Sequence, residues 1–243
     1  VYQNRVIDAL QKHFQVSPKR FYQFYAAPKS GKEDTTRSRS LLFFSHAILL
    51  ASGMNKPVKL YIPENGVISM NIPLTEHRMG SLSTRTTHPY FMGLLQELLN
   101  SLGLKITIVN PYQFKTKGEM MSECKDFDFL KSNYPLTMSC SHPDLGRWKK
   151  ETESSHCGVC LPCTIRRAAI MKAGLEDESF YRDPQYKDIE AETNLRSYKL
   201  GLTQKKTPIW AIQESGPITH HRQDFADLYQ RGLAELKEFI DTL

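Results

Sequence analysis

Four cysteines stand at spacings that suit a metal ion. Cys140, Cys157, Cys160 and Cys163 form the pattern C-x16-C-x2-C-x2-C. Thiolates bind zinc well, and a two-residue spacing lets a tight turn direct several sulfurs at one ion. The stretch between the first two cysteines has no apolar run, so a metal would hold a loop that cannot pack alone. Because four protein ligands leave no open position, the predicted zinc is structural.

Other ligands and another type of centre compete with this interpretation. His142 and His156 are alternative ligands. An iron–sulfur cluster is a rival because ferredoxins also use C-x2-C-x2-C, but their fourth cysteine followed by proline is absent. Four thiolates on one Zn²⁺ carry a net charge of about −2, which Arg166 and Arg167 could offset. Cys124 lies outside the pattern and is interpreted as an ordinary free cysteine.

Composition narrows the class of protein. The chain has 243 residues, of which 40% are hydrophobic and 24% charged, as in globular proteins. No apolar run reaches the ~18 residues of a membrane span. Five cysteines, an odd number, and no visible signal peptide fit a cytoplasmic protein better than a disulfide framework.

A basic segment and a polar loop could contact a ligand. Residues 1–39 carry eight Lys and Arg against three Asp and Glu, which suits the phosphates of a nucleotide or nucleic acid, with a solvated surface as an equal alternative. The loop "NIPLTEHRMGSLSTRTTHP", residues 71–89, is rich in hydroxyls and cations. Long ordered loops of this kind are often functional.

The elements that must position these residues alternate between helix and strand. Such βα units indicate a parallel sheet covered by helices. Thr116 and Glu119 form a capping box. We expect helices over 2–14, 40–52, from Pro89 to about Gly103, from Thr116 to about Leu130, from the cysteines to Gly174 and over about 222–241, with strands over 58–62 and 104–110, a turn over 63–66 and weak patterning over 182–221.

Four blocks resemble the QueC family, the 7-cyano-7-deazaguanine synthases. They are "RSLLFFSHA", beginning at Arg39; "TRTTHPYF"; "NPYQFKTKGEM"; and "CGVCLPCTIRRAAIMKAG". "PENGVISMNIPLTEHRMGSLSTRTTHP" and "SCSHP" resemble more closely the QatC branch found in bacterial antiphage Qat cassettes. The resemblance covers roughly residues 36–181.

The resemblance implies an α/β fold: the C-terminal part of a Rossmann-like PP-loop domain with a helical zinc-binding subdomain. It suggests domains at 1–110 (the remaining part of the PP-loop domain), 111–181 (zinc-binding) and 182–243 (a C-terminal helical extension). The family's S-G-G-x-D-S phosphate loop is absent from these residues, and "ASGMNKP" reads as a helix end. We therefore expect the phosphate loop to lie upstream of Val1 and to bind ATP with magnesium in the full-length enzyme.

The resemblance also implies a reaction: 7-carboxy-7-deazaguanine is activated by ATP as an acyl-adenylate and transferred to ammonia or a protein amine. We expect Glu64 and Asn65 to read the base and Arg85 to hold the carboxylate. His88 would relay a proton. The hydroxyls of Thr84, Thr86 and Thr87 would bind substrate, and Arg39, Lys115 and Lys117 would bind phosphate.

Each assignment has a structural alternative: Glu64 and Asn65 in a turn, the others on the surface. The expected partners are the deazapurine and a protein of the same defence cassette. The competing hypothesis is an inactive, zinc-stapled module that binds nucleic acid or a partner protein. Neither hypothesis involves a membrane.

Overall fold

A computed structural model describes residues 2–24, 39–72, 74, 86–146, 150–204 and 206–243, without the side chain of Arg39. The helices are α1 (Tyr2–Phe14), α2 (Arg39–Ser52), α3 (Gly66–Met70), α4 (Pro89–Ser101), α5 (Lys117–Ser122), α6 (Phe127–Asn133), α7 (Leu161–Lys172), α8 (Ile189–Thr203), α9 (Pro208–Ala211) and α10 (Arg222–Ile240). The strands are β1 (Val58–Tyr61) and β2 (Ile106–Val109), and 3₁₀ turns span Pro18–Arg20, Tyr134–Leu136 and Ile212–Ser215. Within these described ranges, no helix has the length and hydropathy of a membrane span.

The chain forms two compact units, each built from separated stretches of sequence. The cysteine unit comprises Val1–Tyr22, Thr116–Lys205 and Arg231–Leu243. The sheet unit comprises Gln23–Lys115 and Lys206–Gln230. Helix α10 thus contributes its first half to the sheet unit and its second half to the cysteine unit. The three consecutive domains expected from the sequence stay a prediction.

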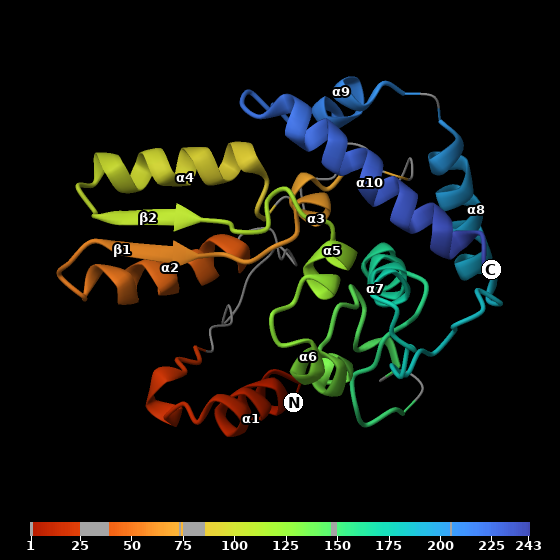
Figure 1. The fold of residues 1–243 in the computed structure, drawn as a ribbon, viewed down its shortest axis with the longest axis horizontal. Helices are drawn as coiled ribbons and strands as arrows, with labels where there is room; N and C mark the ends of the chain where they lie inside the picture. The colour runs from red at the N-terminus through yellow and green to blue at the C-terminus, as the bar shows by residue number, and fades with distance from the viewer. Residues whose placement is uncertain (1, 25–38, 73, 75–85, 147–149, 205) are drawn as a thin grey trace. The chain divides into compact units, whose positions relative to one another are not determined.

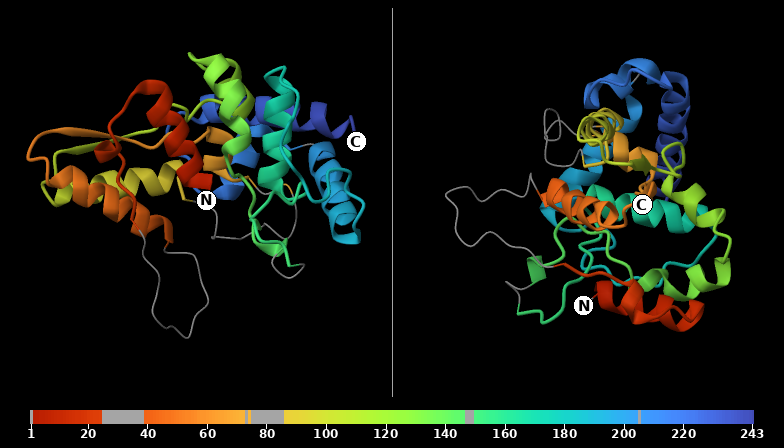
Figure 2. Two further views of the ribbon diagram at one scale, coloured as in Figure 1. Left: turned by 90° about the horizontal axis from the view of Figure 1, so that it is seen from below. Right: turned by 90° about the vertical axis from the view of Figure 1, so that its left-hand side faces the viewer.

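The sheet unit contains the expected parallel strands. β1 and β2 pair in parallel, with Val58 opposite Ile106 and Leu60 opposite Ile108. These alternating residues point to one face, where they pack with Ala51 of α2 and Leu99 of α4. Both helices lie on the same side of the strands, as the left view of Figure 2 shows. The predicted arrangement of parallel strands and covering helices is confirmed.

The cysteine unit is mainly helical. α5 lies beside α7, where Met121 packs on Ala169 and Ile170 (Figure 1). α1 lies beside α6, as the right view of Figure 2 shows, and His13 contacts Asp126 across 2.6 Å. These contacts bring the N-terminal helix and the segments around the cysteines into one body.

The single helix predicted from Thr116 to about Leu130 forms two separate helices, α5 and α6. The capping box at Thr116 is present, with its hydroxyl accepting from Glu119 N and its own N–H donating to the Glu119 carboxylate. However, α5 ends at Ser122, so the predicted continuation to Leu130 is wrong. The Asp126 carboxylate accepts from Phe129 N and starts α6 as a separate helix. A side-chain cap inside an apolar pattern overrides the periodicity.

The sequence predicts α10 clearly but not α8, because the two helices differ in their apolar periodicity. α10 buries its apolar stripe in the chain itself, including Phe225, Leu228, Leu236, Phe239 and Ile240, as the periodicity predicts. α8 falls in the segment expected to be weakly patterned. It buries only Ala191 and Tyr198, so its sequence carries little amphipathic signal.

Candidate functional site

The four predicted metal ligands come together in the cysteine unit. The sulfurs of Cys140, Cys157, Cys160 and Cys163 all lie within 4.8 Å of one another. The Cys140–Cys160 distance is 4.0 Å and the Cys157–Cys163 distance is 3.9 Å. A tetrahedral ion with Zn–S bonds of about 2.3 Å places its sulfurs ~3.8 Å apart. The sulfurs therefore fit a tetrahedral metal centre and indicate structural zinc.

Backbone groups prepare this cluster for thiolates. The N–H groups of His142 and Cys157 donate to the sulfur of Cys140, and that of Cys160 donates to Cys157, each at 3.3 Å. Gly158 adopts φ +90°, which only glycine tolerates readily, and lets the chain turn between two ligands. Cys163 lies in the first turn of α7, where the helix dipole favours a thiolate.

The close approach of the four sulfurs shifts the pKa values of the thiols. Hydrogen bonding, first of all with Cys140, lowers the pKa of Cys157 far below its usual range. The pKa values of Cys160 and Cys163 are raised, again chiefly through Cys140. Four thiolates this close repel one another, and a divalent cation would let all of them ionise together.

The competing ligands lie at the edge of the cluster. His156 Nδ1 is 3.9 Å from the sulfur of Cys163, and its Nε2 pairs with the Thr137 carbonyl at 3.2 Å. Burial lowers the pKa of His156, so the ring is neutral at physiological pH. His142 contacts Cys140 through its backbone N–H. Among the residues that the structure describes, only the four cysteines form a metal-binding group.

The two arginines after the cluster have mainly structural partners. Arg166 is 3% exposed and donates to the Thr137 hydroxyl at 2.6 Å and the Tyr134 carbonyl at 2.8 Å. Arg167 lies over the ring of Phe239, 4.7 Å from its centroid, and donates to the Gly158 carbonyl at 3.4 Å. Arg167 thus supports the turn between two ligands, while charge compensation by both arginines stays a prediction.

In the sheet unit, predicted site residues gather where the strands end. Glu64 follows β1 and Asn110 follows β2. The Asn110 amide donates to the Glu64 carbonyl at 2.8 Å, which ties the two loops together. In open α/β sheets, ligands bind beyond these carboxyl ends. Asn110 was not among the predicted site residues, although Asn-Pro after a strand is a visible loop signal.

The segment predicted as a turn over residues 63–66 connects β1 to a short helix that the sequence did not indicate, because α3 starts at Gly66. Asn65 is 2% exposed and caps α3, its side chain accepting from Ile68 N at 3.0 Å. Its amide also donates to the Glu64 carboxylate at 3.1 Å. Gly66 donates to the Lys115 carbonyl at 3.0 Å, and a Cβ there would lie 2.0 Å from the Gln113 carbonyl. This close approach of two backbones requires glycine.

The end of the polar loop is buried by contacts with its own unit. The Thr86 hydroxyl lies 2.8 Å from that of Ser40, and the Thr87 hydroxyl lies 3.1 Å from that of Ser69. His88 is 3% exposed and caps α4, its Nδ1 accepting from Tyr90 N at 3.2 Å. Its Nε2 lies 3.3 Å from the hydroxyl of Ser215, a contact that the sequence did not indicate. This geometry is that of a helix cap, and the proton relay assigned to His88 stays a prediction.

The structure does not place the side chains of the other predicted site residues at the carboxyl ends of the strands. Thr84, Arg85 and the side chain of Arg39 lie outside the described residues. Lys115 contributes its carbonyl to Gly66 in the sheet unit. Lys117 begins α5 in the cysteine unit, where its Nζ lies 3.4 Å from the Ser139 hydroxyl. The phosphate-binding roles of these residues stay predictions.

Comparison with known proteins supports the resemblance to the QueC family over part of the chain. Residues 86–174 match the family described as Queuosine biosynthesis protein QueC. No curated protein and no solved structure matches the chain significantly. The matched range contains β2, the capping box and all four clustered cysteines. Over residues 86–174, the chain therefore carries a QueC family domain.

Proposed function

We propose that the protein activates a 7-carboxy-7-deazaguanine with ATP and transfers its acyl group to an amine. QueC family proteins use ATP, and the QueC match over residues 86–174 is the observation that carries this proposal. A carboxylate oxygen would attack the α-phosphorus of ATP, and pyrophosphate would leave. The amine nitrogen would then attack the carbonyl carbon of the acyl-adenylate, lose a proton and displace AMP.

The chain's own residues would bind and orient the substrate. The loops after β1 and β2, joined by Asn110 and Glu64, would form the edge of the site. Arg85 precedes α4 by four positions and would pair with the substrate carboxylate before activation. Zinc on the four cysteines would hold the intervening loop and take no part in the reaction.

The acceptor and the biological role rest on the sequence resemblance alone. In the QatC branch the acceptor would be a protein amine, and the partner would be a protein of the same cytoplasmic antiphage cassette. In the housekeeping branch the acceptor would be ammonia. A screen of both amines separates these two versions of the proposal.

The reaction is tested with the protein expressed from its complete reading frame. Incubation with ATP, Mg²⁺ and 7-carboxy-7-deazaguanine should release AMP and pyrophosphate only when the carboxylate is present. Arg85→Ala should lower turnover thirtyfold or more, because a lost bidentate contact to a charged group costs ~2–5 kcal/mol. Arg196→Ala is the matched control, because Arg196 forms an exposed pair with Glu192.

His88 is tested with a variant that keeps its structural contact. Asparagine also caps helices well, so His88→Asn should fold normally. If His88 relays a proton, this variant loses turnover at an unchanged melting temperature. Wild-type turnover by both His88→Asn and Arg85→Ala would rule out the loop as the site.

A binding module is the second candidate function, favoured by the basic residues 1–39. In that case AMP is not released under any condition. The protein instead binds RNA or DNA with an affinity that falls steeply as salt rises. Binding of a cassette protein without turnover would equally support a module without catalysis.

A further inference from the structure

A cavity of about 270 Å³ lies within the sheet unit, between α4 and the segment before α10. Tyr90, Gly93 and Glu97 line it from the helix, and Gln113 and His220 line it from two loops. Gln113 follows β2, so the cavity lies at the carboxyl end of the sheet, where α/β folds bind ligands. Its volume is just below the usual range of about 300–1,000 Å³ and suits one small ring system.

Gly93 keeps one wall of this cavity open. It lies inside α4, where glycine lowers helix stability relative to alanine. A Cβ built there would meet nothing within 4 Å among the described atoms, so packing in the sheet unit does not require glycine. A glycine that packing does not explain is typical of a place where a ligand approaches the backbone closely.

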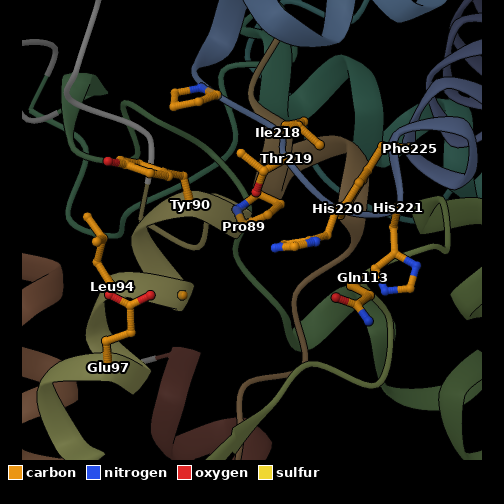
Figure 3. Close-up of a pocket in the computed structure, with 12 residues that line it drawn as sticks. Pro89, Tyr90, Leu94, Glu97, Gln113, Ile218, Thr219, His220, His221 and Phe225 are labelled. Carbon is orange, nitrogen blue, oxygen red and sulfur yellow. The ribbon is translucent and has the colours of Figure 1, made fainter. Parts of the chain in front are cut away.

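Polar groups from three segments converge on the same space. Figure 3 shows the His220 ring directed toward α4 and the Glu97 carboxylate directed back along that helix. Within the described part of the chain, no hydrogen bond or ion pair occupies the side chains of Glu97, Gln113 or His220. The carboxylate only accepts hydrogen bonds, whereas the amide both donates and accepts. Phe225, 3% exposed, supplies an apolar surface beside them.

We propose that this cavity seats a flat nitrogen heterocycle whose edge carries adjacent N–H donors. Glu97 accepts two N–H groups of that edge, as a carboxylate does from a guanine-type amidine. Gln113 and His220 contact the remaining polar atoms, and the ring lies against the backbone at Gly93. The inference rests on the proposed function, because 7-deazaguanine has the same adjacent N–H donors. It assigns recognition of the base to Glu97 in place of Glu64.

The structure favours Glu97 over Glu64 for this role. Glu64 already accepts from the Asn65 amide, and Asn65 is committed to capping α3. Glu97 is exposed and lines the cavity, and no hydrogen bond within the described residues uses its carboxylate. A carboxylate that lines a cavity beside a glycine not required by packing has the properties expected of a group that recognises a ligand.

Equilibrium binding of guanosine, measured by calorimetry or ligand-observed NMR, tests this inference without any turnover. We expect saturable binding to the wild-type protein and at least tenfold weaker binding of inosine, which lacks the 2-amino group. Glu97→Gln should weaken guanosine binding at least tenfold. Glu238→Gln, an exposed carboxylate of the cysteine unit, should leave it unchanged.

Gly93 gives a second, independent readout. Gly93→Ala should raise the melting temperature, because alanine favours a helix, while weakening guanosine binding. Gly93→Leu should fill the cavity and abolish binding. Unchanged binding in Glu97→Gln or Gly93→Leu, loss of binding in Glu64→Gln alone, or no guanosine binding at all would overturn the inference. Absence of AMP release with intact guanosine binding would instead refute only the proposed reaction.

Discussion

Both units pair their buried polar side chains, but the sheet unit also has a cavity lined by exposed polar side chains. In the cysteine unit, buried polar groups have partners in the same unit. Arg166 donates to a carbonyl and to hydroxyls, and backbone N–H groups donate to the sulfurs of Cys140 and Cys157. In the sheet unit, Glu97, Gln113 and His220 face a cavity without a partner among the described residues. Under the proposed function, the cysteine unit stabilises the fold, whereas the exposed polar groups of the sheet unit contact the ligand.

The largest expected effect comes from removing one metal ligand. Cys160→Ser should abolish stoichiometric zinc and unfold the cysteine unit, because binding of structural Zn²⁺ contributes about 10–16 kcal/mol in small zinc domains. Elemental analysis should find about one zinc per wild-type chain. Circular dichroism should then show loss of helix in the variant.

Cys124→Ser is the matched control for this change. Cys124 lies outside the cluster, and its thiol donates to the Asp126 carbonyl. The control should keep its zinc and its melting temperature. If Cys160→Ser melts like wild type, the cluster does not stabilise its unit. Iron in the purified protein would support the iron–sulfur alternative instead.

A smaller but clear loss is expected from Arg166→Met. The change removes the hydrogen bonds that the buried guanidinium donates to the Tyr134 carbonyl and to the Thr137 and Ser179 hydroxyls, although the Tyr134 carbonyl still accepts from Thr137. We expect the free energy of unfolding to fall by ~3 kcal/mol, measured by denaturant titration. Arg196→Met removes an exposed i,i+4 pair and should cost about 0.5 kcal/mol or less. Equal losses in both variants would contradict the distinction between buried and exposed arginines.

A similar test applies to the sheet unit. Asn65→Ala removes the cap of α3 and leaves Ile68 N without its acceptor. The unfolding free energy should fall by about 1–2 kcal/mol, as for other helix caps. Guanosine binding should persist, because Asn65 caps α3 and does not line the cavity. If binding is lost while stability is unchanged, Asn65 is a recognition residue, as the sequence suggested.

The smallest effect is a dependence on pH that involves Glu235. This carboxylate is 8% exposed and accepts from the Thr116 hydroxyl and from Gly118 N. Burial raises the pKa of Glu235 above its usual value, which outweighs these hydrogen bonds. Its contribution to stability is therefore complete below the unfolded pKa of about 4.3 and decreases as pH rises through the raised native pKa.

Glu235→Gln does not titrate and shows this effect by comparison. The wild-type protein should lose unfolding free energy relative to Glu235→Gln as pH rises from 4 to 8 in ~1-unit steps. Glu238→Gln changes an exposed neighbour on the same helix and should show no such trend. A constant difference between wild type and Glu235→Gln would mean that Glu235 has an ordinary pKa.

The sequence by itself determined the features that depend on near neighbours. The ligand spacing around Cys160, the start of α4 at Pro89 and the capping box at Thr116 all follow from residues a few positions apart. The apolar run over 58–62 likewise predicted the strand that the structure has at Val58–Tyr61. Such signals work because caps, turns and strand faces are set by spacings of two to four residues.

Only the tertiary structure decided which distant groups meet. Glu235 reaches the capping box across a sequence separation of 119 residues, and Ser215 reaches His88 across 127. Asp126 divides a continuous apolar pattern into two helices, and Asn65, at the end of the expected turn, caps a helix that starts at Gly66. The cavity at Gly93 exists because residues 217–221 return to α4. No local pattern encodes these contacts, because they depend on where the chain returns after folding.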